Sequence, residues 1–219
     1  MSRHGATSTC GGSQQSVILD TDASAPRRNG STVTPPLRQI SHRHGAYAAS
    51  ITADRQAKDA YFRAAADSPV RRPGADVHAL SYFPVDAKYR IVVARLRRPP
   101  PNDRPIALDT SDGLGRIARR VAYLDFDLHG QRLALTALSF GPTERGTLFV
   151  PFADATSGNE TYSSGRYLDL EIEPDGSVVL DFNLAYQPYC AYSSAYSCPL
   201  TPTENRLAVP ILAGERLAP

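Results

Sequence analysis

The sequence predicts a mainly β fold, an antiparallel β-sandwich or barrel with one N-terminal helix. Many short runs of β-branched and aromatic residues follow one another between turn residues, which is typical of such folds. One stretch, 52–66, carries opposite charges at helical spacing instead. Residues 1–46 are rich in Ser, Thr, Gly, Pro and Arg and lack apolar periodicity, so we expect a disordered tail. Residues 47–219 are then expected to form a single domain.

The one expected helix covers residues 52–66. Thr52 is suited to the N-cap position, and Asp54 and Lys58 have the four-residue spacing of an ion pair on a helix face. The run ends before Pro69, because the residue that precedes a proline avoids the α region. We expect this helix to pack across a sheet rather than to bind a ligand.

Strands are expected along the rest of the chain, because the apolar runs are short and bounded by turn residues. The first strand must end before the run Pro99-Pro100-Pro101, since proline lacks the N–H that a sheet ladder needs. The expected strands are 89–96, the two arms of a hairpin around His129-Gly130, 147–152, 167–173, 177–183 and 207–212.

The hairpin around His129-Gly130 has the most clearly specified register. A two-residue turn places apolar residues opposite apolar residues on one face and polar residues opposite polar residues on the other. The expected pairs are Leu128 with Gln131, Phe126 with Leu133, Leu124 with Leu135, Asp127 with Arg132, and Tyr123 with Thr136.

A second hairpin, over residues 167–183, suggests a pair of carboxylates. A three-residue Pro174-Asp175-Gly176 turn aligns the apolar residues of both arms on one face, with the pairs Ile172/Val178, Leu170/Leu180 and Leu168/Phe182. On the opposite face Asp169 then lies across from Asp181, and Tyr167 across from Asn183.

Directly opposed residues have Cβ atoms about 4.5–5.5 Å apart, so two carboxylates there repel each other. The repulsion requires a nearby arginine, a bound cation, or one protonated carboxyl. Arg166 and Arg206 are the candidate arginines. Asp169 and Asp181 are therefore candidate ligands of a divalent metal or candidate acid and base groups. Alternatively, they form a structural pair that an arginine bridges.

The segment around this hairpin is too polar and too rich in tyrosine for a simple connecting loop. Tyrosines can bury their rings while the hydroxyl group stays hydrogen-bonded, so they can line a ligand pocket or simply pack on a sheet. The candidate ligand-binding residues are Glu160, Tyr162, Arg166, Tyr167, Asp169, Asp181, Asn183, Tyr192, Asn205 and Arg206.

Two of the three cysteines, Cys190 and Cys198, lie in the same segment. Their spacing is wider than the two to four residues of a zinc knuckle, and no framework of cysteines typical of secreted domains is present. We expect free, buried structural thiols, with a local disulfide as the second interpretation and a metal pair as the third.

The composition limits the partners of the chain. A net charge of +2 argues against electrostatic nucleic-acid binding, and the near absence of lysine (only Lys58 and Lys88) indicates genomic bias toward arginine rather than phosphate recognition. No apolar run reaches the roughly 20 residues of a membrane span, and no signal peptide is apparent, so we expect a cytoplasmic protein. The motifs of nucleotide, zinc-protease and hydrolase sites are not found, and no cofactor is evident.

Several blocks resemble the domain of unknown function 1684 family. They are residues 53–59, 82–86, 148–158, 165–169, 180–183, 190–192, 198–200 and 204–207. The resemblance extends from about residue 51 to 216, with Gln187-Pro188 where Asn-Pro is usual. It implies a prokaryotic protein with no assigned activity. It also places Asp169, Asp181, Asn183 and both domain cysteines inside motif blocks of the family.

Three functions remain open at this point. The first is binding of a small polar ligand or a divalent ion beside Asp169, Asp181 and the tyrosines. The second is hydrolysis, since two carboxyl groups about 5 Å apart suit a retaining glycosidase. The third is a structural or interaction module in which the polar segment forms a rigid cap.

Overall fold

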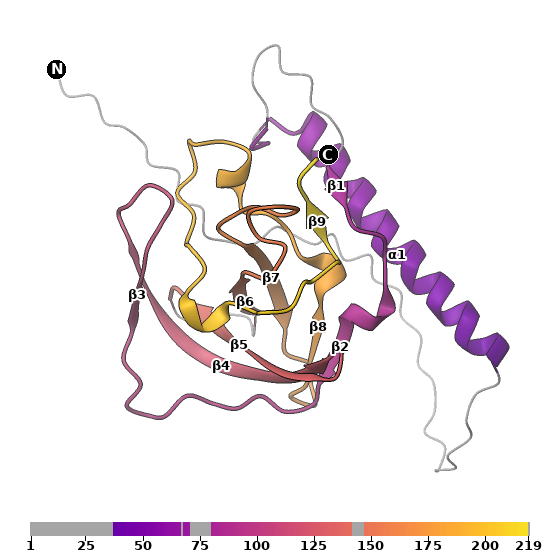
Figure 1. The fold of residues 1–219 in the computed structure, drawn as a ribbon, viewed down its shortest axis with the longest axis horizontal. Helices are drawn as coiled ribbons and strands as arrows, with labels where there is room; N and C mark the ends of the chain where they lie inside the picture. The colour runs from indigo at the N-terminus through magenta and orange to yellow at the C-terminus, as the bar shows by residue number, and fades with distance from the viewer. Residues whose placement is uncertain (1–36, 67, 71–79, 142–146, 219) are drawn as a thin grey trace.

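The computed structural model describes residues 37–66, 68–70, 80–141 and 147–218, and shows an antiparallel β fold with a single α-helix (Figure 1). The helix α1 is Leu37–Ala64. The strands are β1 Ser81–Tyr82, β2 Arg90–Val93, β3 Ile106–Leu108, β4 Arg116–Leu128, β5 Gln131–Ser139, β6 Thr147–Phe152, β7 Arg166–Glu171, β8 Val178–Asp181 and β9 Glu215–Arg216. Short 3-10 helices cover Ala87–Tyr89, Phe182–Leu184, Tyr189–Ala191 and Thr203–Asn205.

The strands form one five-stranded sheet, in the order β3-β4-β5-β6-β7, and two small sheets, β2-β8 and β1-β9. The sheets do not close on one another, so the fold is a sandwich rather than a barrel. This confirms the predicted mainly β class with one N-terminal helix. One apolar core lies between the sheets and contains Leu124, Leu135, Val150, Leu168, Leu180 and Phe182, none of which is more than 1% exposed.

The β4–β5 hairpin has the predicted turn and register. All five predicted pairs are present. His129 and Gly130 have φ values of 52° and 75°, as a two-residue turn of type I′ requires. The register shifts between Arg120 and Ala122, which makes Val121 the extra residue of a β-bulge.

The predicted pairing of β7 with β8 is wrong beyond its first pair. Ile172 and Val178 do form the bridge next to the turn, but the two strands then diverge. β7 pairs with β6 in the large sheet, and β8 pairs with β2 in a small one. Leu170 and Leu180 still point into the same core, because the two strands now enclose it from different sheets.

Helix α1 begins earlier than predicted, at Leu37, and therefore includes residues 37–46 of the expected tail. Thr52 is not its N-cap, because the Thr52 hydroxyl donates to the Ala48 carbonyl at 2.8 Å inside the helix. The rest of the expected tail, residues 1–36, lies outside the described residues. No helix in the described ranges is long and apolar enough to cross a membrane.

The expected strand at 207–212 is also absent as a strand. Buried and exposed residues do alternate along this segment, since Leu207, Val209 and Ile211 are buried while Ala208 and Pro210 are exposed. The segment runs across the core as irregular backbone, and proline at position 210 removes a donor that a ladder would use.

Candidate functional site

The two candidate metal ligands do not face each other. Asp169 on β7 lies opposite Phe149 of β6, and its Oδ2 accepts a hydrogen bond of 2.6 Å from the Tyr186 hydroxyl. Asp181 on β8 lies opposite Arg90 of β2. The expected cross-strand carboxylate pair is therefore wrong, because the strands that were to carry it belong to different sheets. Among the described residues, no group of three or more His, Cys, Asp or Glu could hold a metal ion.

Asp181 instead anchors helix α1. The Tyr47 hydroxyl of α1 donates to the two carboxylate oxygens of Asp181 at 2.9 and 2.7 Å. The Asn183 backbone N–H donates to the same carboxylate at 3.0 Å, and Arg90 Nε lies 3.8 Å away. Burial and the neighbouring carboxylate both raise the pKa of Tyr47, so the hydroxyl stays protonated and remains a donor. Asn183 also bonds the backbone of Asp86 through its side-chain amide, at 2.8 and 3.0 Å.

Arg166 does not bridge the two aspartates as expected. Its guanidinium is fully buried and pairs with Asp154 Oδ2 at 2.8 Å. Its two Nη groups also donate to the carbonyls of Ile211 at 2.9 Å, Glu215 at 3.0 Å and Ala213. Burial lowers the pKa of Arg166, and the Asp154 carboxylate opposes that shift. Arg166 therefore holds the C-terminal segment against the core.

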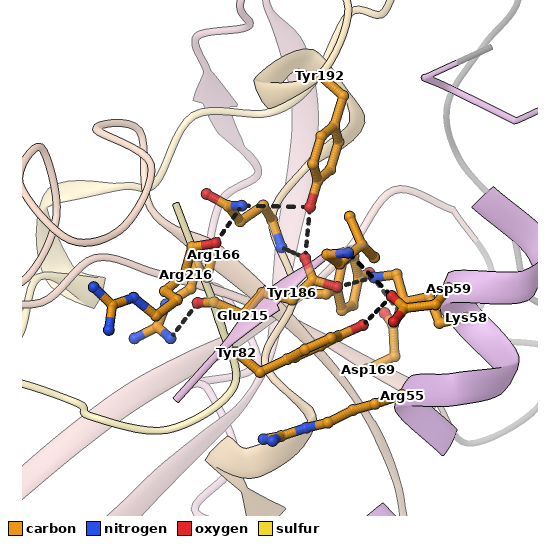
Figure 2. A network of polar contacts seen from close by, with 12 residues as sticks. Arg55, Lys58, Asp59, Tyr82, Arg166, Asp169, Tyr186, Tyr192, Glu215 and Arg216 are labelled. Atoms are coloured by element: carbon orange, nitrogen blue, oxygen red, sulfur yellow. Dashed lines mark hydrogen bonds and ion pairs between the residues drawn. The ribbon is translucent and has the colours of Figure 1, made fainter. Parts of the chain in front are cut away.

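A second buried charge, Glu215, is the centre of the polar network in Figure 2. The residue is 1% exposed, and its Oε2 accepts hydrogen bonds from the Gln187 backbone N–H at 2.7 Å and the Tyr192 hydroxyl at 2.8 Å. The ammonium of Lys58 forms an ion pair with Oε1. Burial and this carboxylate raise the pKa of Tyr192, so its hydroxyl also remains a donor.

Lys58 and its neighbours on α1 form the docking face of the helix. The Lys58 ammonium lies 4.8 Å from the centre of the Tyr186 ring and 5.3 Å from that of Phe62. Arg55 donates to the carbonyl oxygens of Phe83 at 2.9 Å and Asn183 at 3.3 Å. The described part of α1 buries few apolar side chains, chiefly Ile51 and Phe62. The helix is thus held on the sandwich largely by polar contacts to side chains and carbonyls.

Sequence reasoning missed both Lys58 and Glu215 as members of this network. One signal was available, because Lys58 is one of only two lysines in a chain rich in arginine. The compact ammonium of Lys58 lies between two aromatic rings and pairs with the Glu215 carboxylate.

The other predicted site residues have structural or peripheral positions. Asn205 is fully buried and bonds the Thr136 backbone and the Pro151 carbonyl, at 2.6 to 2.8 Å. The Tyr167 hydroxyl is buried and donates to the Pro199 carbonyl. Arg206 is exposed, while Glu160 and Tyr162 are half-buried. These candidates therefore have different environments, from the buried contacts of Asn205 and Tyr167 to the exposed position of Arg206.

A surface groove that the sequence did not predict lies between β4 and the loop that joins β2 to β3. It has a volume of about 220 Å³. We call it the arginine groove, and its lining residues are Arg98, Pro99, Pro100, Asp103, Arg104, Arg119, Arg120 and Val121.

Two features of the backbone hold the groove in shape. The loop begins where Arg97 and Tyr123 exchange backbone hydrogen bonds of 3.1 and 2.7 Å, and it ends in β3, which pairs with β4. Consecutive prolines restrict the loop between these two points. The β-bulge at Val121 interrupts the alternation of β4, so the consecutive residues 119, 120 and 121 all reach the groove.

The groove has an excess of positive charge. Arg120 pairs with Glu204 at 2.8 and 3.0 Å and lies 3.5 Å from Asp103. Arg98, Arg104 and Arg119 are exposed and form no ion pair with the described residues. Four arginines thus face two carboxylates when Glu204 is included, an excess of two positive charges.

Two comparisons with known proteins found similarities. A family described as "Protein of unknown function (DUF1684)" matches residues 75–216, which include the arginine groove but not residues 53–59 of α1. A solved structure, the solution NMR structure of an uncharacterized protein from Haloarcula marismortui, is 37% identical. The similarity covers 80% of this chain and 97% of the archaeal one, with a TM-score of 0.61. No curated protein matches the chain.

Proposed function

The chain belongs to the DUF1684 family, whose description assigns no activity, and we propose from the geometry that it binds a small anionic ligand in the arginine groove. The observation that carries the proposal is the set of three exposed arginines, Arg98, Arg104 and Arg119, around one concave surface, which form no ion pair with the described residues. Like charges that converge on a groove repel one another, and a bound anion removes that repulsion.

The chemistry of the lining favours a phosphate or carboxylate ligand. A guanidinium offers a planar fork of N–H donors that matches the two oxygens of either group. The groove volume of about 220 Å³ leaves room for a small polyatomic anion such as a pyrophosphate, a sugar phosphate or a tricarboxylate. With a net charge of only +2 over the whole chain, a compact anion fits better than a nucleic acid.

The same lining favours binding over catalysis. Asp103 is the one carboxylate among the lining residues of the groove, and Arg120 lies 3.5 Å from it. The lining includes no histidine, cysteine, serine or lysine. A hydrolase built on Asp169 and Asp181 receives less support, since these two residues have separate partners.

Calorimetric titration of the full chain with inorganic phosphate, pyrophosphate and citrate tests the proposal. We expect pyrophosphate and citrate to bind more tightly than phosphate, because each can contact several guanidinium groups at once. The double variant Arg98→Gln/Arg119→Gln should weaken binding at least about tenfold, which corresponds to roughly 1.4 kcal/mol. Arg63→Gln, which removes an exposed arginine from α1, is the matched control and should leave the affinity unchanged.

Two results would overturn the proposal. One is the lack of any binding heat with all three anions at millimolar concentration and low ionic strength. The other is an equal loss of affinity in Arg63→Gln and in the groove variant, since that would indicate diffuse attraction to a positive surface rather than a site.

A further inference from the structure

Cys190 and Cys198 lie together at a place that anion binding does not use. Both are free thiols in the structure; Cys198 is fully buried, whereas Cys190 is only half-buried. The Cys190 backbone N–H donates to Cys198 Sγ at 3.3 Å. A half-buried cysteine is thus in direct contact, through its backbone N–H, with the sulfur of a fully buried one.

Cys198 is held firmly in this position. Its N–H donates to Ser111 Oγ at 3.0 Å, and its carbonyl accepts from the Ser111 N–H at 2.9 Å. The next residue, Pro199, bridges to Thr110. The buried thiol is therefore fixed to the loop after β3, while Cys190 approaches it from the 3-10 helix Tyr189–Ala191.

The surroundings of Cys190 stabilise its thiolate. The neighbouring Cys198 and Tyr162 side chains lower the pKa of the Cys190 thiol to about 6, with the Cys198 contact as the largest cause. Burial and the neighbouring sulfur raise the pKa of Tyr162, so its hydroxyl remains a donor. Cys190 is then mostly ionised at neutral pH, which is the state in which cysteine acts as a nucleophile.

We propose that Cys190 is an oxidation site for hydroperoxides and that Cys198 is its resolving thiol. The Cys190 thiolate attacks one oxygen of hydrogen peroxide, the O–O bond breaks, and the departing hydroxide takes up a proton to leave as water. Sulfur is oxidised to the sulfenic acid while the peroxide is reduced. Cys198, as its thiolate, then attacks the Cys190 sulfur. The S–O bond breaks, the disulfide forms, and hydroxide takes up the proton that Cys198 released and leaves as a second water.

Two other uses of the thiols receive less support from the surroundings. A structural zinc site needs four ligands, and no cluster of three or more His, Cys, Asp or Glu is found within the described ranges. A purely structural role does not require that one cysteine stay half-buried beside a fully buried one.

The test uses the full chain with Cys10→Ser, so that Cys190 and Cys198 are the only thiols. After treatment with one equivalent of hydrogen peroxide, we expect both thiols to be lost and the intact mass to fall by that of two hydrogen atoms. Cys198→Ser should instead accumulate a sulfenic acid at Cys190 that dimedone traps. Cys190→Ser should leave Cys198 reduced, because the remaining thiol is buried.

A pH profile on the unsubstituted pair keeps the test valid if either variant fails to fold. Because the pKa of Cys190 is lowered, its alkylation by iodoacetamide should accelerate as pH rises through about 6 and level off above that value. An ordinary thiol has a pKa of about 8.5, so its alkylation reaches half the maximal rate only near that pH.

Three outcomes would overturn the proposal. They are thiols that stay reduced in peroxide, a disulfide that joins two chains instead of one, and an alkylation profile centred near that of an ordinary thiol. None of these outcomes depends on anion binding, so this inference and the proposed function can fail separately.

Discussion

Lys58→Met removes the cation that neutralises the buried carboxylate of Glu215. The substitution keeps the length and most of the apolar volume of the side chain, so contacts with Phe62 and Tyr186 are largely retained. Breaking a buried ion pair by removing one partner costs about 3–5 kcal/mol of folding free energy, because the other charge is left uncompensated.

The structure places the expected cost at the lower end of that range. The Lys58 side chain is 17% exposed, so water partly screens the pair, and Glu215 keeps its hydrogen bonds from Tyr192 and Gln187. We therefore expect Lys58→Met to lower the free energy of unfolding by about 3 kcal/mol. Urea unfolding at pH 7, followed by far-ultraviolet circular dichroism, measures this directly.

A surface ion pair of the same chain is the matched control. Arg132 and Asp127 are 2.9 Å apart, but their side chains are 65% and 69% exposed. Arg132→Gln should therefore cost only about 0–1 kcal/mol. A Lys58→Met cost as small as that of Arg132→Gln would refute the reasoning. So would strict additivity of Lys58→Met and Glu215→Gln, because residues in direct contact should show coupling.

Two further substitutions test contacts elsewhere in the fold. Tyr47→Phe removes the hydroxyl that bonds both oxygens of Asp181. It should lower the free energy of unfolding by about 1.5 kcal/mol in the same assay, as expected for a hydrogen bond to a charged group. An unchanged urea midpoint would show that α1 does not depend on this contact. Gly165→Ala places a methyl group 2.3 Å from the Phe152 carbonyl oxygen at a φ of 95°, whereas Gly113→Ala, at a φ of 78°, meets open space. Both substitutions should lower the free energy of unfolding by about 1–2 kcal/mol through backbone strain. Gly165→Ala should lower it by about 1–3 kcal/mol more, because its methyl group overpacks against Phe152. Equal losses in the two variants would contradict this close contact.

The β4–β5 hairpin could be predicted from sequence because its determinants are local. His129 and Gly130 both accept a positive φ, and the alternation on either side of them leaves only one register that keeps each face uniform. No information from distant residues is needed to place these strands.

The partners of β7 and β8 could not be predicted in the same way. Leu170 and Leu180 meet the same apolar core whether their strands pair side by side or belong to separate sheets. The pattern of apolar residues is identical in both cases, so it specifies which face is buried but not which strand is the neighbour. The error placed Asp169 and Asp181 opposite each other, and the candidate metal site followed from it.

The arginine groove was not predictable for a different reason. Its shape depends on the bulge at Val121, which allows Arg119 and Arg120 to line the same surface although they follow each other along a strand. A bulge of this kind leaves no clear mark in the alternation of a strand that is partly exposed. In addition, the abundance of arginine was interpreted as genomic bias, so the few arginines that line the groove could not be told apart from the rest.

The most direct test of the anion site follows the arginine side chains themselves. In nitrogen-15-labelled protein, the Nε–Hε resonances of Arg98, Arg104 and Arg119 can be followed while inorganic pyrophosphate is added. We expect these three to shift together along one saturable curve, while Arg63 on α1 stays in place. Shifts of equal size at Arg63 and at the groove arginines, or no saturation, would contradict the claim that the groove is an anion site.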